Sequence, residues 1–544
     1  MAGLGVVLEY VALSVMIPLS GVSQGASGIA IKVNSIWYDA ADWVGLPSES
    51  RTWLWLFLLL LGLRITVGFA QVSLNTWVSK RVLAHLSGGT FARVVMFEPI
   101  SEIYRRSVGH YTSLAGDEAV RVGQVFFHLA QTVSALFAAA IGLFVLFIFS
   151  VSVFKLTMLF LLLSATGIGL AMRRVLGWSQ ESAILSREAN TTFIEGFNGI
   201  RSIRSMAGES FVADRYRNFI ERYGRVLFLL DVFSHGSRSL PGLLLIGLGL
   251  VLLFPAAGFF PDFSAFYFLS VTTMLMRVLS FLGAAVSSGG RVSIDIRAAF
   301  DLEEIIGEPD AAVNQGERRQ ISAVSTIHMS SLSCGYKTGH PVLTGVCAEL
   351  QAGRCYVLMG KSGSGKSTLS DVLLGLLPPL SGSLQIDGLD YQEVDLESLR
   401  RKVVLVEQQT RIFSGSLREN ITFGLIASDR DIDLAVDIAG LREFVKSLPR
   451  GLETRLDYQG ANLSGGQKQR IGLARAVVRD PDVLILDEAT SALDSHTRDQ
   501  ILDRLKAVFK EKILLLITHD QHVMKLADEV WSIQKGRLIT HATQ

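Results

Sequence analysis

The stretch Gly360-Lys-Ser-Gly-Ser-Gly-Lys-Ser-Thr368 decides how the rest of this chain is interpreted. Its spacing, G-x-x-x-x-G-K-S, is that of a phosphate-binding loop. The apolar run Cys355–Met359 before it suits a buried strand, and Leu369–Leu377 after it suits a helix. In that context the glycines let backbone N–H groups surround phosphate oxygens, and the helix N-terminus adds positive potential. The competing interpretation is a chance glycine-rich turn, which the complete motif disfavours.

The loop predicts a site for ATP and Mg²⁺. Lys366 would contact the β- and γ-phosphates, and Ser367 would ligate the metal. The predicted nucleotide-binding residues of the loop are Gly360, Ser362, Gly363, Ser364, Gly365, Lys366, Ser367 and Thr368.

Two further stretches carry a family resemblance. Asn462-Leu-Ser-Gly-Gly-Gln467 is followed by Val483-Leu-Ile-Leu-Asp-Glu488. With the phosphate loop, they make the chain resemble an ATP-binding-cassette (ABC) protein, whose signature matches Leu463–Gln467 and whose Walker B strand matches Val483–Glu488. The resemblance implies that Asp487 holds Mg²⁺ and that Glu488 polarises the attacking water.

The remaining motifs of that family follow in its order over about residues 325–544. They place Gln408 in the Q-loop, His519 as the switch histidine, Tyr336 against adenine and Asp494 in the D-loop. The resemblance implies that Gln408 also ligates Mg²⁺ and that His519 and Gln408 assist catalysis. It further implies that the signature of one chain completes the ATP site of another, through Ser464, Gly465, Gly466, Gln467 and Asp494.

Composition divides the chain into a membrane part and an ATPase part. Of 544 residues, 49% are hydrophobic and 19% charged, which is fewer charges than a soluble protein of this length carries. The predicted fold class is an α-helical six-span membrane domain followed by an α/β P-loop nucleotide-binding domain. The predicted bounds are 1–306 for the membrane domain, 307–323 for a linker and 324–544 for the ATPase domain. The net charge of +1 argues against a nucleic-acid partner.

Six apolar runs predict the spans, and basic segments predict the orientation. The runs are 3–21, 53–78, 126–149, 154–171, 226–254 and 263–285. The Lys- and Arg-rich segments 80–123 and 173–225 are expected in the cytoplasm. A signal peptide is the alternative for the first run, but the basic flank that such a peptide needs is missing. The expected location is a bacterial-type inner membrane.

The two basic segments resemble the cytoplasmic extensions of exporters of the type IV fold. Ile100–Gly109 and Arg204–Phe211 are similar to the coupling helices of such exporters, and solvated helical hairpins are the alternative. The chain shows one cassette, so it resembles half a transporter. Because its motifs are complete, a homodimer with two competent sites is expected. Glu407 and Arg411 depart from the family pattern beside Gln408, with an expected local effect on the loop.

Ionisable residues inside the spans are candidates for substrate contact. They are Glu9, Arg64, Asp231, Arg238 and Arg277. For the two arginines, Arg64 and Arg277, one interpretation is an ion pair between helices, with Glu9 as partner. The other is a basic lining for an anionic headgroup, with Glu9, Arg64 and Arg277 as the candidate substrate residues. Leu8–Leu19 and the amphipathic loop after it also resemble bacterial flippases for lipid-linked oligosaccharides, in a short match.

These observations predict ATP-driven export or flipping of an amphipathic substrate, with a lipid or lipid-linked oligosaccharide as the favoured class. A multidrug or peptide exporter is the alternative within the same class. An ATP-gated channel or sensor is the alternative from another class, and the intact Glu488 argues against it.

The three cysteines, Cys334, Cys347 and Cys355, show no metal-ligand spacing and are expected to be reduced packing residues.

Overall fold

The computed structural model describes all residues except 1, 20–27, 46, 48, 150, 254–264, 307–317, 338, 521 and 543–544. The chain divides into two compact units. The first unit consists of Met1–Glu98 and Arg106–Glu308, and the second of Pro99–Arg105 and Pro309–Gln544. Most of the predicted linker and the connection before the sixth predicted span lie outside the described residues.

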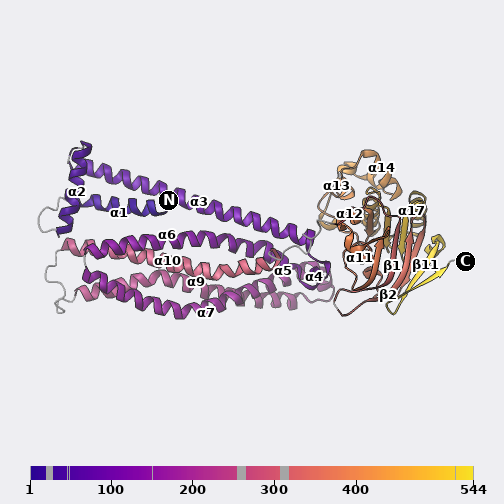
Figure 1. Ribbon diagram of the computed structural model, residues 1–544, viewed down its shortest axis with the longest axis horizontal. Helices are drawn as coiled ribbons and strands as arrows, with labels where there is room; N and C mark the ends of the chain where they lie inside the picture. The colour runs from indigo at the N-terminus through magenta and orange to yellow at the C-terminus, as the bar shows by residue number, and fades with distance from the viewer. Residues whose placement is uncertain are drawn as a thin grey trace. The chain divides into compact units, whose positions relative to one another are not determined.

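The first unit is built from helices that, apart from α2, run side by side (Figure 1). They are α1 (Ala2–Leu19), α2 (Gly28–Val44), α3 (Ser50–Phe97), α6 (Ala119–Phe149), α7 (Val151–Asn198), α9 (Glu209–Leu253) and α10 (Ala265–Ile306). Apart from α2, each coincides with one of the six apolar runs. At 1.5 Å per residue, the 48 residues of α3 extend about 72 Å, more than twice the ~30 Å of a hydrocarbon core. Helix α3 therefore continues well beyond its predicted span.

Length and composition identify two stretches of the described residues as able to cross a membrane, Arg51–Phe97 and Val108–Phe147. The number of six spans stays a prediction. Within the unit α10 packs along α6, α9 along α7, and α1 along α3.

Short elements join the long helices. They are α4 (Ile100–Arg105), α5 (Val108–Ser113), the π-helical turn η1 (Leu114–Glu118) and α8 (Ile200–Ser205). The first predicted coupling segment, 100–109, is thus divided between α4 and α5. The second predicted coupling segment, 204–211, does not form one helix. It covers the end of α8, a turn at Met206–Gly208 and the start of α9. That turn contains Ala207 in the left-handed region, at φ 51°.

Buried charges tie the extended helices together. Glu118 is 2% exposed, and its carboxylate lies 3.7 Å from Arg121 Nη1 and 3.5 Å from Arg187 Nη2. Arg187 also contacts Asp301 of α10 at 2.6 Å.

The second unit is a predominantly parallel α/β domain with an added antiparallel sheet. The main sheet has the order β12 (Arg537–Ala542), β11 (Glu529–Gln534), β3 (Cys355–Gly360), β10 (Ile513–Ile517), β9 (Val483–Asp487) and β6 (Val403–Val406). The antiparallel sheet has the order β2 (Leu343–Gln351), β1 (Thr326–Cys334), β4 (Ser381–Ile386) and β5 (Leu389–Asp390). A short ribbon joins β7 (Gly415–Ser416) to β8 (Arg455–Leu456).

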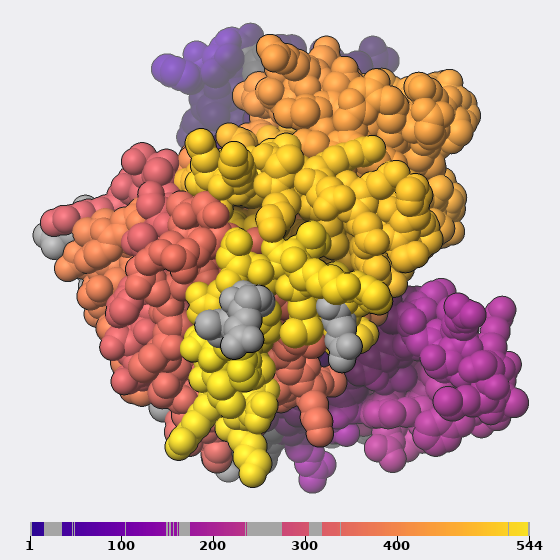
Figure 2. All heavy atoms as spheres, turned by 90° about the vertical axis from the view of Figure 1, so that its right-hand side faces the viewer, coloured from indigo at the N-terminus to yellow at the C-terminus, as the bar shows by residue number. Residues whose placement is uncertain are grey.

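In addition to α4, seven α-helices belong to this unit in its described part. They are α11 (Lys366–Leu373), α12 (Leu396–Lys402), α13 (Leu417–Thr422), α14 (Asp429–Ile438), α15 (Arg442–Ser447), α16 (Gly465–Val477) and α17 (Ser495–Val508). Figure 2 shows the C-terminal part of the chain, in yellow, on the surface of this unit. The predicted fold class, a helical membrane domain followed by an α/β P-loop domain, is confirmed.

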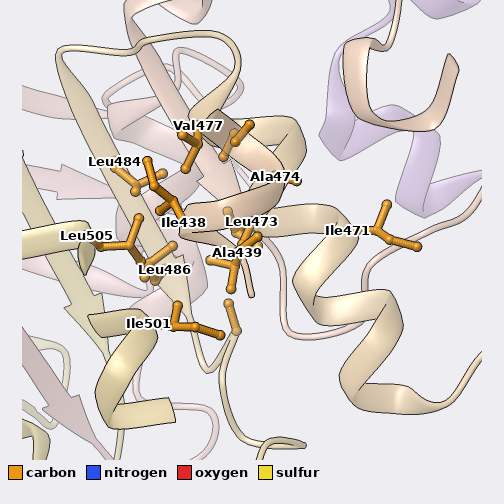
Figure 3. Close-up of a cluster of buried hydrophobic side chains, with 14 of the residues drawn as sticks. Ile438, Ala439, Ile471, Leu473, Ala474, Val477, Leu484, Leu486, Ile501 and Leu505 are labelled. Atoms are coloured by element: carbon orange, nitrogen blue, oxygen red, sulfur yellow. The ribbon is translucent and has the colours of Figure 1, made fainter. Parts of the chain in front are cut away.

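The central strands β9 and β10 are apolar up to Asp487 at the end of β9, because both faces of the sheet are covered. In β9, Leu484 and Leu486 face a core shared with α14, α16 and α17, which Figure 3 shows. Val483 and Ile485 face the opposite core, shared with α11 and the antiparallel sheet. This alternation is the two-residue period of a strand, and it explains why these runs lack polar residues.

Two of the three cysteines belong to these cores. Cys334 and Cys355 are buried, and Cys347 is exposed; all three are free thiols. Burial raises the pKa of Cys334 to about 11 and that of Cys355 to about 12, so both are protonated near neutral pH.

Candidate functional site

The phosphate loop connects the end of β3 to the start of α11. Gly363 and Gly365 have φ of +75° and +112°, which glycine adopts without steric cost. A Cβ at Gly365 would also lie 2.6 Å from Leu343 Cδ2 of β2. These two glycines therefore allow the loop to turn sharply and lie close to the neighbouring strand.

Polar groups of the loop suit an anion. Lys366 Nζ donates hydrogen bonds to the carbonyl oxygens of Gly360 and Lys361, at 2.9 and 3.2 Å. The hydroxyl of Ser364 is buried and has no hydrogen-bond partner among the described residues. An ammonium held over the loop and an unsatisfied buried hydroxyl are the features that phosphate oxygens would satisfy. The residues present therefore fit ATP.

The predicted catalytic residues come together at the carboxyl end of the sheet. Gln408 Nε2 donates to Glu488 Oε2 at 2.7 Å, and His519 Nδ1 lies 3.1 Å from Glu488 Oε1. Strands β9 and β10 are parallel and paired in register, with Asp487 opposite Ile517, so the residues after each strand meet at one edge. A pocket of about 140 Å³ adjoins Glu488 and His519 and has room for water.

Glu488 has an unusual backbone conformation. Its φ of 48° is in the left-handed region, where a non-glycine residue is uncommon and strained. Its N–H donates to the carbonyl of Ile517 at 2.9 Å, which fixes this turn against β10. The strained backbone is thus held where its side chain meets Gln408 and His519.

Asp487 and Ser367 supply oxygen ligands beside Glu488. Burial raises the pKa of Asp487, the neighbouring Glu488 carboxylate raises it further, and Lys366 and a hydrogen bond with Ser367 oppose the shift. Among the described residues no three His, Cys, Asp or Glu side chains gather into a metal cage. A carboxylate, a hydroxyl and the amide of Gln408 suit Mg²⁺, which takes few protein ligands beside phosphate and water.

The signature segment begins helix α16. Ser464 caps it: its hydroxyl accepts from Gln467 N at 3.2 Å, and Gln467 Oε1 accepts from Ser464 N at 2.8 Å. Gly465 and Gly466 follow, and a Cβ at Gly466 would lie 3.1 Å from the carbonyl oxygen of Ala492. Within the part of the chain that the structure describes, no hydrogen bond joins this segment to the phosphate loop.

Asp494 and Tyr336 are both held by hydrogen bonds within the chain. Asp494 caps α17 by accepting from Thr497 N at 2.9 Å, and this hydrogen bonding lowers the pKa of Asp494. Tyr336 donates from its hydroxyl to Asp371 Oδ2 of α11 at 2.5 Å. Its ring packs against the core that also contains β3. These contacts do not involve a nucleotide, so the stacking of Tyr336 on adenine stays a prediction.

The sequence interpretation missed Gln469, which lies at the centre of the site. This side chain is 4% exposed. Its Nε2 donates to the carbonyl oxygens of Gln408 and Glu488 and to Ser491 Oγ, at 3.3, 3.4 and 3.2 Å. Its Oε1 accepts from Ala492 N at 3.0 Å. Gln469 therefore connects the signature helix to the Q-loop, to Glu488 and to the D-loop.

The sequence departs from the family pattern at Glu407 and Arg411. Near these two residues, a second side chain of α16, that of Arg475, connects the helix to the segment after Gln408. The carbonyl of Arg411 accepts from both Nη atoms of Arg475 of α16, at 3.2 Å. The guanidinium of Arg475 also lies over the rings of Phe413 and Phe423, 5.6 and 4.8 Å from their centroids. The side chains of Glu407 and Arg411 are exposed, and their effect on loop stiffness stays a prediction.

Gln469→Leu is expected to lower kcat for ATP about 10- to 100-fold and to change KM for ATP less than about two-fold. Leucine keeps the volume but removes all four hydrogen bonds, so Glu488 and the Q-loop lose their shared support. Steady-state ATPase kinetics on the full chain measure kcat and KM for ATP separately. Lys468→Leu, at the neighbouring position outside this network, is the control. A comparable fall in kcat for both variants would contradict the positioning role.

Four of the five candidate residues in the predicted spans have charged partners that the structure describes. Glu9 of α1 contacts Arg64 of α3 and Arg277 of α10, each at 2.8 Å. Asp231 lies 4.0 Å from Arg291 Nη2. The side chain of Arg238 lies outside the described residues. The three candidate substrate residues are therefore together, in the arrangement that the ion-pair interpretation also predicts.

Fold and site together define a membrane-bound P-loop ATPase. The family model "ABC transporter transmembrane region" matches residues 14–254, and the model "ABC transporter" matches residues 343–491. The chain therefore belongs to the ABC transporters. It combines a transmembrane region with an ATP-binding domain, and its ATP hydrolysis is coupled to transport.

Three similar proteins illustrate the breadth of the family. The heterocyst differentiation ATP-binding protein HepA of Nostoc sp. is 29% identical over 431 residues, 78% of this chain and 70% of that protein. The ATP-dependent lipid A-core flippase of Alcanivorax borkumensis is 29% identical over 480 residues, 85% and 80% of the two chains. The human mitochondrial iron-sulfur clusters transporter ABCB7 is 28% identical over 365 residues, 65% and 48%.

A solved structure shares the fold. It is titled as a bacterial Atm1-family ABC exporter with ATP bound, and it superposes with a TM-score of 0.78. The superposition covers 98% of this chain and 92% of that chain at 21% identity. The whole chain therefore has the fold of an ABC exporter.

Proposed function

We propose that this transporter exports or flips an amphipathic substrate with an anionic headgroup across a bacterial-type inner membrane. A lipid or lipid-linked oligosaccharide is the favoured substrate class. Two of the similar proteins, from Alcanivorax borkumensis and Nitrosococcus oceani, are named lipid A-core flippases, which supports a lipid substrate. Another is named an iron-sulfur clusters transporter, so similarity alone does not select the substrate.

The observation that carries the proposal is the Arg64–Glu9–Arg277 cluster. Each residue is near the middle of its predicted span, where charges are costly and usually functional. Two guanidiniums and one carboxylate leave a formal charge of +1. An anionic headgroup would neutralise that charge, whereas an uncharged drug or peptide would not.

The ATP site is proposed to work through positioning and charge. Lys366, Ser364 and the backbone of the phosphate loop bind the phosphates, and Tyr336 stacks on adenine. Mg²⁺, held by Ser367, Asp487 and Gln408, would neutralise charge on the phosphates. Glu488 accepts the proton of the attacking water, while Gln408 and His519 orient its carboxylate. The hydrogen bonds to Glu488 at 2.7 and 3.1 Å support this assignment.

Each site is proposed to be completed by a second, identical chain. Ser464, Gly465, Gly466, Gln467 and Asp494 would contact the nucleotide held by the partner's phosphate loop. The lack of a hydrogen bond between the signature and the phosphate loop in the described part of this chain supports that arrangement. Because Glu488 and the signature are both present, a homodimer has two competent sites. ATP binding then closes the two cassettes, and hydrolysis separates them to drive alternating access.

An ATP-gated channel or sensor is a candidate from another class. Such a protein needs ATP binding but no turnover, so it would not need the support that Gln408, His519 and Gln469 give to Glu488. That support favours a transporter that completes the hydrolytic cycle.

The double variant Arg64→Gln/Arg277→Gln is expected to weaken activation by an anionic amphiphile. In phosphatidylcholine nanodiscs, hexadecyl phosphate should stimulate the ATPase of the unmodified chain. The double variant should need at least about ten-fold more hexadecyl phosphate for half-maximal stimulation, because both headgroup contacts are lost. Hexadecanol is the neutral comparison for the ligand, and Arg51→Gln, at the start of α3, is the control variant. An unchanged response in a folded double variant would overturn the proposal.

A further inference from the structure

His519 lies in a short segment after β10, and its side chain is mostly exposed. The exposed fraction is 75% for His519, against 19% for Glu488. A side chain with so much exposed surface has few packing contacts that fix its ring. The distance of 3.1 Å between His519 Nδ1 and Glu488 Oε1 therefore depends on how firmly the backbone of this segment is held.

The residue after His519 connects the segment to another element. Asp520 Oδ1 accepts from the backbone N–H of His522 at 2.8 Å, and the Asp520 N–H donates to Thr518 Oγ1 at 3.0 Å. These two bonds close a turn within the segment. The other carboxylate oxygen of Asp520, Oδ2, accepts from Arg498 Nη1 of helix α17 at 2.6 Å. The ion pair thus ties the turn to α17.

Arg498 is itself well fixed in α17. Its side chain is 16% exposed, and its backbone N–H donates to the carbonyl oxygen of Asp494, the residue that caps the helix. Arg498 Nε also donates to Asp499 Oδ1 at 3.0 Å. Two carboxylates around one guanidinium leave no surplus positive charge. Arg498 is therefore unsuited to bind a phosphate and well suited to hold Asp520.

The ion pair also borders the cavity beside the catalytic residues. Arg498 and Asp520 line the same pocket of about 140 Å³ as Glu488 and His519. Buried apolar side chains such as Leu502 of α17 line it as well, and they offer no hydrogen bond to an imidazole. The pair is therefore a polar connection, at this cavity, between α17 and the segment that carries His519.

We propose that Arg498 is a positioning residue for ATP hydrolysis. Through Asp520 it fixes the segment that carries His519, so that the imidazole stays within hydrogen-bonding distance of Glu488. This inference rests on the role proposed for His519 and deepens it. In this role Arg498 contacts neither the nucleotide nor the attacking water. Its loss therefore slows turnover and leaves the affinity for ATP nearly unchanged.

Arg498→Met is expected to lower kcat for ATP about 5- to 20-fold and to change KM less than about two-fold. Methionine keeps the apolar packing of the side chain but loses the charge-assisted hydrogen bond to Asp520. Asp520→Asn tests the pair from the other side and should lower kcat by a similar factor. Asparagine has one acceptor oxygen, which cannot serve both His522 N and Arg498. Steady-state ATPase kinetics of the full chain in phosphatidylcholine nanodiscs measure both constants.

A double-mutant cycle with His519→Ala tests whether Arg498 acts through the histidine. His519→Ala alone should lower kcat about 20- to 100-fold. Adding Arg498→Met should then change kcat by less than about two-fold further, because the side chain to be positioned is already absent. Lys512→Met is the control. It breaks the ion pair with Asp480, at the opposite end of β10 from His519, and should keep kcat within about two-fold.

The outcomes separate the two proposals. If His519→Ala keeps full kcat, the role proposed for His519 is wrong, and the role of Arg498 falls with it. If His519→Ala slows hydrolysis but Arg498→Met and Asp520→Asn do not, only the inference about Arg498 is wrong. Losses that multiply in the cycle, or an equal fall in kcat for Lys512→Met, overturn the inference as well. If Arg498→Met does not fold, Asp520→Asn takes its place in the cycle.

Discussion

Glu488→Gln is expected to slow ATP hydrolysis by about 10²- to 10⁴-fold while ATP binding persists. Glutamine keeps the shape of the side chain and can still meet Gln408 and His519, but it cannot accept the proton of the attacking water. Phosphate release measures the rate, and a fluorescent ATP analogue measures binding. Glu511→Gln removes an exposed carboxylate to which no part of the site is assigned and serves as the control, with activity within about two-fold of the unmodified chain.

The same variant tests the assembly. If two identical chains close on ATP, Glu488→Gln should accumulate with ATP and Mg²⁺ as a dimer of twice 59.4 kDa in native mass spectrometry. A monomer, or a complex with another chain, would contradict the homodimer. Retained hydrolysis in Glu488→Gln would assign the proton acceptor to another group.

Lys366→Ala is expected to weaken ATP binding by about 10- to 100-fold and to abolish stimulated hydrolysis. The ammonium already lies over the loop, bonded to two of its carbonyl oxygens. Its removal deletes the positive charge of the side chain while leaving the glycine turns intact. Equilibrium binding of the same fluorescent analogue gives the affinity.

Lys361→Ala is the matched control for Lys366→Ala, since Lys361 belongs to the same loop but its side chain is exposed. Its ATP affinity should fall by less than about three-fold, as expected for a screened surface charge. Equal losses in the two variants would mean that general loop charge, and no specific contact by Lys366, holds the phosphates.

The sequence predicted the ATPase fold well because its signals are local. The phosphate loop needs glycines at fixed spacing, and the strands β9 and β10 are apolar up to Asp487 because they separate two cores. Parallel strands then place Glu488 and His519 at one edge, so their meeting also followed from the motifs. Each of the six apolar runs likewise lies along a helix, while the number of six spans stays a prediction.

The features that were not predicted depend on contacts between distant segments. Gln469 is one polar residue among several in α16, and only the folded chain shows that it meets the Q-loop and D-loop. The lengths of α3 and α7 exceed the apolar runs because their extensions are stabilised by packing and by buried pairs such as Arg187–Asp301. The predicted coupling segment 204–211 contains a turn at Ala207 in a left-handed conformation that sequence spacing does not reveal, and its coupling role stays a prediction.

The length of the helices has a mechanical consequence. Helix α3 has 48 residues and α10 has 42, of which about 20 suffice to cross a bilayer. The remainder of α3 therefore extends about 40 Å beyond the hydrocarbon. A rigid rod of that length that tilts by about 5° moves its far end by about 3–4 Å. Each long helix is thus a lever that turns a tilt of a few degrees at mid-membrane depth into a displacement of a few ångström at its far end.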